Sequence, residues 1–344
     1  MSNSKNLLVL GIDEAGYGPN IGPLVIGCSA WIIKEHRTSP SDRRPAAESL
    51  LERLSPVFQA KSDKASFTHI PLGDSKALYS SGDSLDSLAI GVRFWMNSLA
   101  DPIKSFHDFL SAVSPNCIAQ LDKIPWYKRQ TTSRPSIEFF QELSESISSS
   151  LLENANRTCE AQGVQLLGIA ATVIDEGRFN RDVEKYGNKA SLLSQASLRL
   201  AESCLKKYAI PNLSEIGSIH VYCDKHGGRN RYQAFLMDVM PELWFDALSE
   251  SASRSDYRAE WQDLELNWSF LAKGDRLVAS ALASMTAKWI REGLMSRLNH
   301  FWELHLPGLK STAGYPVDAK RFRLAIEPIA DRLGFRLEDW WRAR

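Results

Sequence analysis

An apolar run that ends in two acidic residues constrains the fold more than any other feature of this chain. Residues 7–10 read Leu-Leu-Val-Leu, and Asp13 and Glu14 follow almost at once. A buried carboxylate is costly unless it is paired or bound to a metal. Residues 11–30 (GIDEAGYGPNIGPLVIGCSA) then pass through glycines and prolines into a second apolar stretch. The sequence therefore predicts buried strands at 6–12 and 23–34, a tight turn between them, and a positive charge near the acids.

Composition narrows the class of protein. Lysine plus arginine equals aspartate plus glutamate at 41 each, so a polyanionic partner would need a local basic patch. The five cysteines form no C-x-x-C pair, which argues against a zinc site and favours a reducing, cytoplasmic setting. No apolar run approaches the roughly 18 residues of a membrane helix. We expect a soluble cytoplasmic protein with no membrane contact.

The second half of the chain alternates between strand and helix patterns. Strands are expected at 165–174, 218–223 and 264–272, and helices at 189–208 and 277–298, with a short helix starting in 230–237. Earlier helices are expected near 46–54, 84–100 and 137–160. Strand–helix–strand order implies right-handed crossovers and parallel pairing, and the opening hairpin makes the sheet mixed. The predicted fold class is α/β.

Acidic residues lie at three of the expected strand ends. Asp13 and Glu14 follow the first strand, Asp224 ends the 218–223 strand, and Asp275 lies between the 264–272 strand and the long helix. Carboxyl ends of strands gather sites in open α/β sheets. Four carboxylates suit two Mg²⁺ ions about 3.5–4 Å apart, as used for phosphodiester displacement. The alternatives without a catalytic role are a helix cap for Asp275 and an ordinary turn for Asp224.

Basic residues surround two of these acids. The residues concerned are Lys225, His226, Arg229, Arg231, Lys288 and Arg291. They form either a track for phosphates or an ordinary solvated face. Near the C-terminal end, Trp340 and Trp341 next to Arg342 either stack on bases or pack a surface helix. Both alternatives stay open from the sequence.

The motifs resemble those of the type 2 ribonucleases H, ribonucleases HII and HIII. Residues 13–19 (DEAGYGP) with 22–25 (GPLV) resemble the opening motif of that family. The segments 74–76 (DSK), 222–224 (YCD), 273–275 (KGD, before a helix rich in Ala and Ser) and 314–316 (GYP) follow in the family's order. The resemblance spans roughly residues 6–34, 70–80 and 165–318. Segments 36–66 and 100–160 have no counterpart.

The resemblance implies a ribonuclease H-like mixed sheet flanked by helices, with helical insertions and a helical C-terminal part. We expect a catalytic domain over 1–300, with insertions at about 36–66 and 100–160, and an extension over 301–344 packed on it. The catalytic and metal-binding residues are expected to be Asp13, Glu14, Asp224 and Asp275. The expected substrate-binding residues are Gly16, Tyr17, Gly18, Lys76 and Tyr315, with Arg229 added from the basic residues near Asp224.

The implied activity is a metal-dependent endonuclease. It would use two Mg²⁺ or Mn²⁺ ions, as a monomer, to cut RNA in RNA–DNA hybrids or at embedded ribonucleotides, leaving 3′-hydroxyl and 5′-phosphate ends. The chain departs from the family where Tyr17 replaces an arginine, and we expect weak activity on single ribonucleotides that Tyr17→Arg increases. Two alternatives remain: a two-metal nuclease with a DNA or branched substrate, and a non-catalytic nucleic-acid-binding protein.

Overall fold

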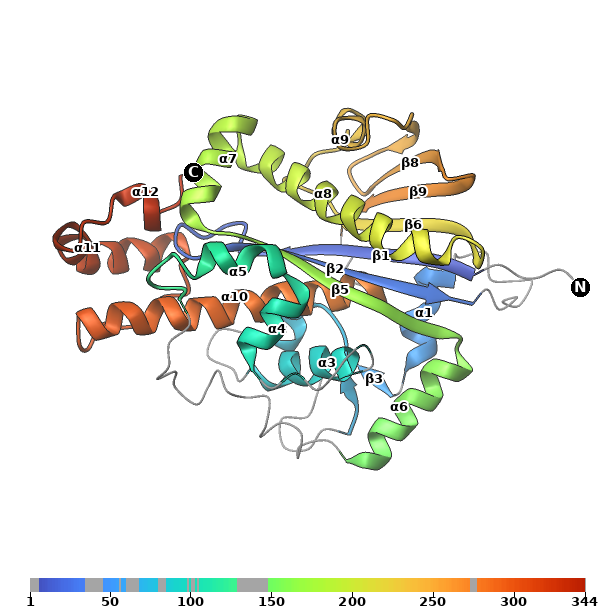
Figure 1. The fold of residues 1–344 in the computed structure, drawn as a ribbon, viewed down its shortest axis with the longest axis horizontal. Helices are drawn as coiled ribbons and strands as arrows, with labels where there is room; N and C mark the ends of the chain where they lie inside the picture. Colours follow the sequence, from blue (N-terminus) through green and yellow to red (C-terminus); the bar gives the residue numbers. More distant parts are fainter. Residues whose placement is uncertain are drawn as a thin grey trace, which may run out of the picture.

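A seven-stranded mixed sheet forms the centre of the molecule (Figure 1). The computed structural model describes residues 6–34, 46–55, 57–59, 68–79, 85–97, 99, 103, 105–128, 148–272 and 277–343. The strand order is β5-β2-β1-β6-β9-β8-β7. The strands are β1 (Asn6–Ala15), β2 (Leu24–Ile33), β5 (Val164–Ile174), β6 (Ile216–Asp224), β7 (Asp246–Glu250), β8 (Arg254–Trp261) and β9 (Leu264–Leu271). The short strands β3 (Phe58–Gln59) and β4 (Ile70–Pro71) pair separately.

Strand directions follow from the connections. The opening hairpin makes β1 antiparallel to β2, and β5 adds to β2 in the antiparallel sense. The crossovers place β6 parallel to β1 and β9 parallel to β6. The strands β8 and β7 then complete the sheet as an antiparallel meander. The parallel trio β1-β6-β9 at the centre brings the carboxyl ends of its strands to one edge.

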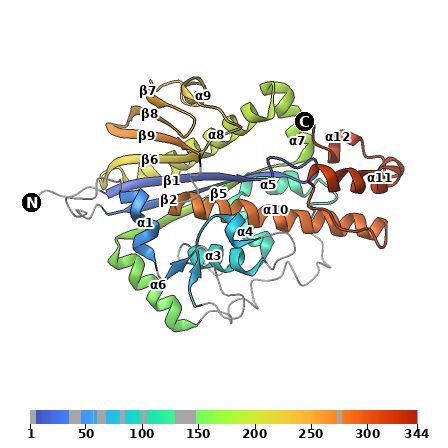
Figure 2. The same cartoon turned by 180° about the vertical axis from the view of Figure 1, so that it is seen from behind.

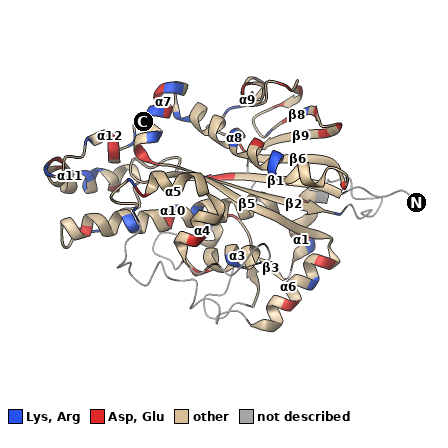
Figure 3. Ribbon diagram, viewed as in Figure 1, with Lys and Arg blue, Asp and Glu red and all other residues tan. Residues whose placement is uncertain are grey.

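Helices cover both faces of the sheet (Figures 1 and 2). One face packs against α8 (Lys189–Ala209) and α9 (Gln233–Val239), and the other against α10 (Val278–His305), α3 (Asp86–Asn97) and α4 (Phe106–Val113). The remaining helices are α1 (Ala46–Leu54), α2 (Ser75–Leu78), α5 (Pro115–Leu121), α6 (Ser149–Ala161), α7 (Glu176–Tyr186), η3 (Ile210–Asn212), α11 (Pro316–Arg332) and α12 (Leu337–Trp340). Acidic and basic residues intermingle over these helices (Figure 3).

The long helix α10 lies unusually close to the sheet. A Cβ atom placed on Gly11 of β1 would lie 2.2 Å from the carbonyl carbon of Ala279, and one on Gly27 of β2 would lie 2.3 Å from the oxygen of Ala283. Only glycine on the strands, facing small residues on the helix, permits this approach. The expectation that the small residues let the helix lie close on the sheet is confirmed.

The predicted fold class is confirmed as an α/β mixed sheet flanked by helices, with a helical C-terminal part. The predicted first strand was too short: β1 extends to Ala15 because β2 continues beside it, with Glu14 opposite Ile26. The elements α2, α7, β3, β4, β7 and β8 were not expected, whereas α4 and α5 fall in the helical insertion expected at about 100–160. The expected helix over 137–160 is observed as α6, and its first part lies outside the described residues. No helix in the described ranges is long and apolar enough to cross a membrane.

Candidate active site

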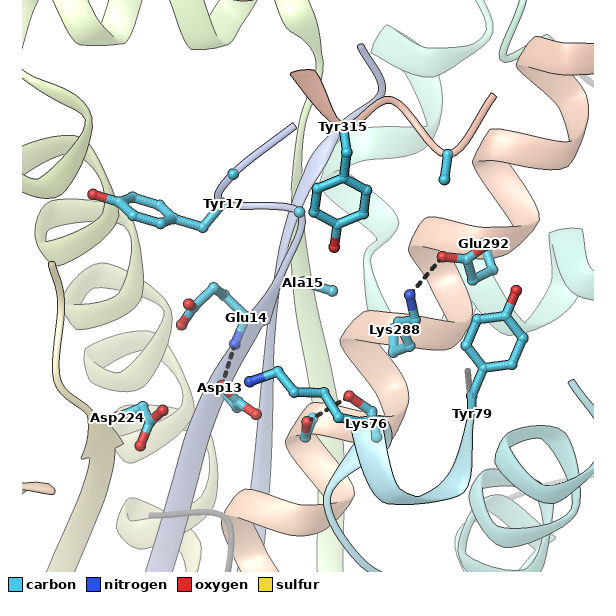
Figure 4. A pocket seen from close by; sticks show the side chains of 15 residues that line it. Asp13, Glu14, Ala15, Tyr17, Lys76, Tyr79, Asp224, Lys288, Glu292 and Tyr315 are labelled. Carbon is cyan, nitrogen blue, oxygen red and sulfur yellow. Dashed lines mark hydrogen bonds and ion pairs between the residues drawn. The ribbon is translucent and has the colours of Figure 1, made fainter. Parts of the chain in front are cut away.

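Two neighbouring parallel strands deliver three of the four predicted carboxylates to one place. The parallel register pairs Ile12 of β1 with Cys223 of β6, so Asp13 and Asp224 come next on adjacent strands. Adjacent strands are about 4.8 Å apart. Glu14 follows Asp13. The pairing of β1 with β6 ends at Ile12, whereas the pairing with β2 continues past Asp13 and Glu14. Figure 4 shows Asp13, Glu14 and Asp224 around the same opening.

This opening is a cavity of about 390 Å³. One side holds the carboxylates and the loop of Gly16, Tyr17 and Gly18, which we call the glycine loop. The facing wall holds Tyr79, Lys288, Glu292 and Tyr315 (Figure 4). The cavity lining brings together three of the four predicted carboxylates, the glycine loop, Lys76 and Tyr315. The sequence analysis missed Tyr79, Ser284 and Glu292.

Asp13 and Glu14 hold their protons more tightly than free acids do. Burial, and then the charge of Asp224, raises the pKa of Asp13 to about 7, although Ser284 and the Glu14 amide donate hydrogen bonds to it. Burial together with the charges of Asp13 and Asp224 raises the pKa of Glu14 to about 8. Repulsion among half-buried acids means that a nearby cation would stabilise their ionised forms.

Lys76 is the lysine that faces the acids. It lies on α2, whose N-cap Asp74 accepts a hydrogen bond from the Lys76 amide at 3.1 Å. A hydrogen bond of 3.0 Å joins the hydroxyls of Ser284 on α10 and Ser75, which fixes this short helix against the long one. Partial burial lowers the pKa of Lys76. The negative charges of Asp74 and of the three carboxylates raise this pKa by more than burial lowers it, so the ammonium stays charged. One lysine balances only part of the negative charge.

The loop after β1 needs glycine at two positions. Gly16 has φ +89° and Gly22 has φ +93°, values that favour glycine strongly. A Cβ on Gly16 would also lie 2.5 Å from the oxygen of Pro23. The amides of Asn20 and Ile21 donate to the oxygen of Gly314, which places Tyr315 at the cavity. The Tyr315 side chain is half exposed there.

Tyr17 points away from the acids (Figure 4). Its ring lies 5.0 Å from the ammonium of Lys189 at the start of α8. A Cβ on Gly227 would approach the Tyr17 hydroxyl to 3.1 Å, so the loop after β6 is also shaped around this ring. Burial and the charge of Glu14 raise the pKa of Tyr17, which keeps its hydroxyl protonated.

The basic residues after Asp224 are less available than the sequence indicated. The Lys225 ammonium donates to the oxygen of Ser251 at 2.6 Å and to Ser255, away from the cavity. His226 is buried, and burial lowers its pKa to about 3, so it carries no charge. Arg229 packs on the Phe235 ring at 4.0 Å and does not line the cavity, although its charge reaches Tyr17. Of the two alternatives for these basic residues, Lys225 and the uncharged His226 do not support a phosphate track.

The fourth predicted carboxylate, Asp275, lies outside the described residues. Within the described ranges, no group of three or more His, Cys, Asp or Glu side chains is arranged to hold a metal ion. The three described carboxylates thus supply suitable oxygen donors and excess negative charge. They do not by themselves form a complete set of ligands.

Comparison with known proteins gives structural neighbours only. No protein-family model matches the sequence, and no curated protein matches it. A chain of the PCNA:RNase HII complex from Archaeoglobus fulgidus is 15% identical with a TM-score of 0.39, over 98% of this chain and 94% of that one. Ribonuclease H2 from Pyrococcus horikoshii OT3 is 13% identical with a TM-score of 0.36, over 97% and 92%.

A third similar structure is Bst-RNase HIII in complex with Mn²⁺. It is 13% identical with a TM-score of 0.40, over 98% of this chain and 67% of that one. The residues of the cavity, rather than these similarities, carry the functional conclusion.

Proposed function

We propose that this protein is a metal-dependent endonuclease that cuts RNA in RNA–DNA hybrids or at embedded ribonucleotides. The products would carry 3′-hydroxyl and 5′-phosphate ends. The observation that carries the proposal is the convergence of Asp13, Glu14 and Asp224 from adjacent strands on one cavity beside Lys76. The resemblance of residues 13–19 to the opening motif of type 2 ribonucleases H supports the choice of substrate.

The donor chemistry of the site fits divalent cations. Carboxylate oxygens are the hard ligands that Mg²⁺ and Mn²⁺ accept. Burial, and then the charges of the neighbouring acids, raise the pKa values of Asp13 and Glu14, and Lys76 offsets only part of this. We propose Mg²⁺ or Mn²⁺, two ions, held by these two residues with Asp224, and Asp275 as a fourth ligand on its sequence motif alone. Such ions supply activation of water and neutralisation of charge at the leaving oxygen.

The chain's own residues would bind and orient the substrate. Lys76 is exposed and close enough to the acids to pair with a phosphate of the strand being cut. The half-exposed Tyr315 ring offers a flat surface for a sugar or base at the cavity mouth. The Arg291 guanidinium lies 5.9 Å from the Tyr315 ring and donates to the oxygen of Ala313, which limits the movement of that ring.

A cleavage assay tests the proposal directly. The protein is incubated with three labelled duplexes in Mg²⁺ and in Mn²⁺: all-DNA, one embedded ribonucleotide, and an RNA tract opposite DNA. We expect cleavage of the ribonucleotide-containing duplexes only, and none with Asp13→Asn. Lys185→Ala, an exposed change on α7, is the control that keeps full activity.

Other outcomes separate the alternatives. Cutting of the all-DNA duplex would overturn the proposed substrate and support a nuclease with a broader range, for which the orientation of Tyr17 away from the acids is the favouring observation. Binding without cleavage in either metal would support a non-catalytic nucleic-acid-binding protein. Calorimetric titration with Mn²⁺ gives an independent check, since binding should be lost in Asp13→Asn.

A further inference from the structure

A buried arginine from the C-terminal segment lies directly behind the glycine loop. The Arg342 guanidinium is 1% exposed and donates to the oxygen of Gly16 at 2.5 Å, of Tyr17 at 3.2 Å and of Gly22 at 3.4 Å. These three carbonyl groups belong to the turn that follows β1. A planar guanidinium with several donors suits such a cluster of acceptors, whereas an ammonium offers one point of charge.

Surrounding contacts hold Arg342 in place. Its guanidinium stacks on the Phe179 ring of α7 at 3.8 Å. Its backbone amide donates to the oxygen of Asn20 at 2.8 Å. Asn180 of α7 binds the residues on either side, donating to the oxygen of Trp341 at 2.9 Å and accepting from the amide of Ala343 at 2.6 Å. The arginine is therefore fixed before any ligand arrives.

The position of Arg342 determines which way the loop amides face. In a trans peptide the carbonyl group and the following N–H point in opposite directions. When Arg342 binds the oxygens of Gly16 and Tyr17, the N–H groups of Tyr17 and Gly18 are turned away from it. In the described part of the chain, neither N–H has an acceptor. Gly16, Tyr17 and Gly18 all line the cavity, and Arg342 does not.

We propose that Arg342 is a positioning residue that turns the Tyr17 and Gly18 amides into the cavity, where they bind the anionic backbone of a nucleic acid. The inference rests on the proposed function and adds to it the residue on which the geometry of the glycine loop depends. Tyr17 itself brings no positive charge to the loop, whereas Arg342 places one directly behind it. Successive backbone N–H groups that point into a concavity are a known form of anion site.

Three variants test this role. Arg342→Met removes the donors but keeps the length of the side chain, and Arg342→Lys keeps one charge. Arg336→Ala is the matched control, because Arg336 begins the same segment and pairs with Glu338 and Asp339. Binding of a labelled RNA–DNA duplex is measured in EDTA by fluorescence anisotropy, and binding of Mn²⁺ by calorimetry. Turnover in Mg²⁺ gives kcat and KM separately.

Arg342→Met should weaken duplex binding and raise KM about tenfold or more, because the loop amides lose their fixed direction. Affinity for Mn²⁺ should stay within twofold, since the carboxylates do not touch Arg342. Arg342→Lys should recover part of the duplex affinity, and Arg336→Ala should match the native protein. Equal duplex binding by the native protein and Arg342→Met would overturn the proposal, as would parallel losses of Mn²⁺ and duplex binding in Arg342→Lys.

Hydrogen exchange separates this inference from the proposed function. If the native protein binds no duplex, the proposed function fails, and duplex binding can no longer be used to test the role of Arg342. Amide exchange of a peptide over residues 15–23 should still be faster in Arg342→Met than in Arg336→Ala. Unchanged exchange in both variants would show that Arg342 does not fix the loop and would overturn the inference independently.

Discussion

The ammonium of Lys189 lies 5.0 Å from the centre of the Tyr17 ring, so this tyrosine is held against the start of α8 rather than over the carboxylates. An arginine at position 17 would lose the cation–π contact, worth about 0.5–1 kcal/mol at an exposed site. It would also meet three like charges, Lys189, Arg229 and Arg342, against the one opposite charge of Glu14. We expect Tyr17→Arg to lower the melting temperature by a few degrees, as read by calorimetry.

The same substitution should strengthen binding to nucleic acid. A charge-assisted contact with a phosphate contributes about 1.5–3 kcal/mol, or roughly ten- to a hundredfold in affinity. We expect the largest gain in cleavage on the duplex with one embedded ribonucleotide. Tyr17→Phe, which keeps the ring beside Lys189, is the control and should change neither property. Equal cleavage by Tyr17→Arg and the native protein would contradict the prediction.

Asp13→Asn should abolish cleavage and stabilise the metal-free protein at alkaline pH. The folded-state pKa of about 7 lies above the ordinary value of 3.8, so the folded chain binds the extra proton between these two values. Stability contributed by that proton is complete below about pH 4 and is lost as the pH rises through 7. Urea unfolding in EDTA at pH 5, 6.5 and 8 should show the native protein weakening more than the variant.

At pH 8 the variant should be more stable than the native protein by about 1–4 kcal/mol, since each pKa unit corresponds to about 1.4 kcal/mol. Adding Mn²⁺ should stabilise the native protein and leave Asp13→Asn unchanged. A variant that loses stability with pH as steeply as the native protein would show that Asp13 is not the group that titrates.

Glu176 provides a second test of how stability depends on pH, at a site separate from Asp13, Glu14 and Asp224. It is fully buried at the start of α7 and accepts hydrogen bonds from the Gly22 amide at 2.9 Å and the Tyr127 hydroxyl at 2.8 Å. Burial raises its pKa to about 7 from 4.5, so its proton stabilises the folded state until the pH passes through 7. Glu176→Gln should flatten the loss of stability between pH 5 and 8 in thermal unfolding. Glu184→Gln, exposed on the same helix, should not.

Gly27→Ala should be strongly destabilising. Gly27 lies opposite Asp13 in the hairpin, and the added Cβ would lie 2.3 Å from the oxygen of Ala283, a backbone atom of α10 that cannot rotate away. Overpacking of this kind costs about 1–3 kcal/mol or more. Gly18→Ala should be nearly neutral for stability, because the Cβ would meet only the Tyr315 ring at 3.9 Å. Urea midpoints of the two variants provide the comparison.

The sequence predicted the parts of the site that depend on local pattern. Asp13, Glu14 and Asp224 follow apolar runs, and parallel pairing then brings strand ends together without further information. Tyr79 and Glu292 were missed because their roles depend on how α2 and α10 pack, which no short motif encodes. The strand β8 was missed although Ser255, Tyr257, Ala259 and Trp261 alternate as buried residues, a signal that was present in the sequence.

The buried role of Arg342 could not be predicted from local pattern. Of the two readings of residues 340–342, packing is the one observed for Trp340, which is 1% exposed. Arg342 instead reaches the glycine loop across α7, a contact that depends on the whole fold. The sequence Trp-Trp-Arg at 340–342 gives no indication that the arginine binds the glycine loop.

The contact between Arg342 and Gly16 also orders events during synthesis. The two residues are 326 positions apart, so at ordinary translation rates Gly16 emerges roughly 20–60 s before its partner exists. The hairpin β1–β2 can form early, because its contacts are local. The turn that joins its strands gains this hydrogen bond only after residue 342 has been made. Asp13 and Glu14 on β1 can therefore take their places in the hairpin well before Arg342 fixes the glycine loop beside them.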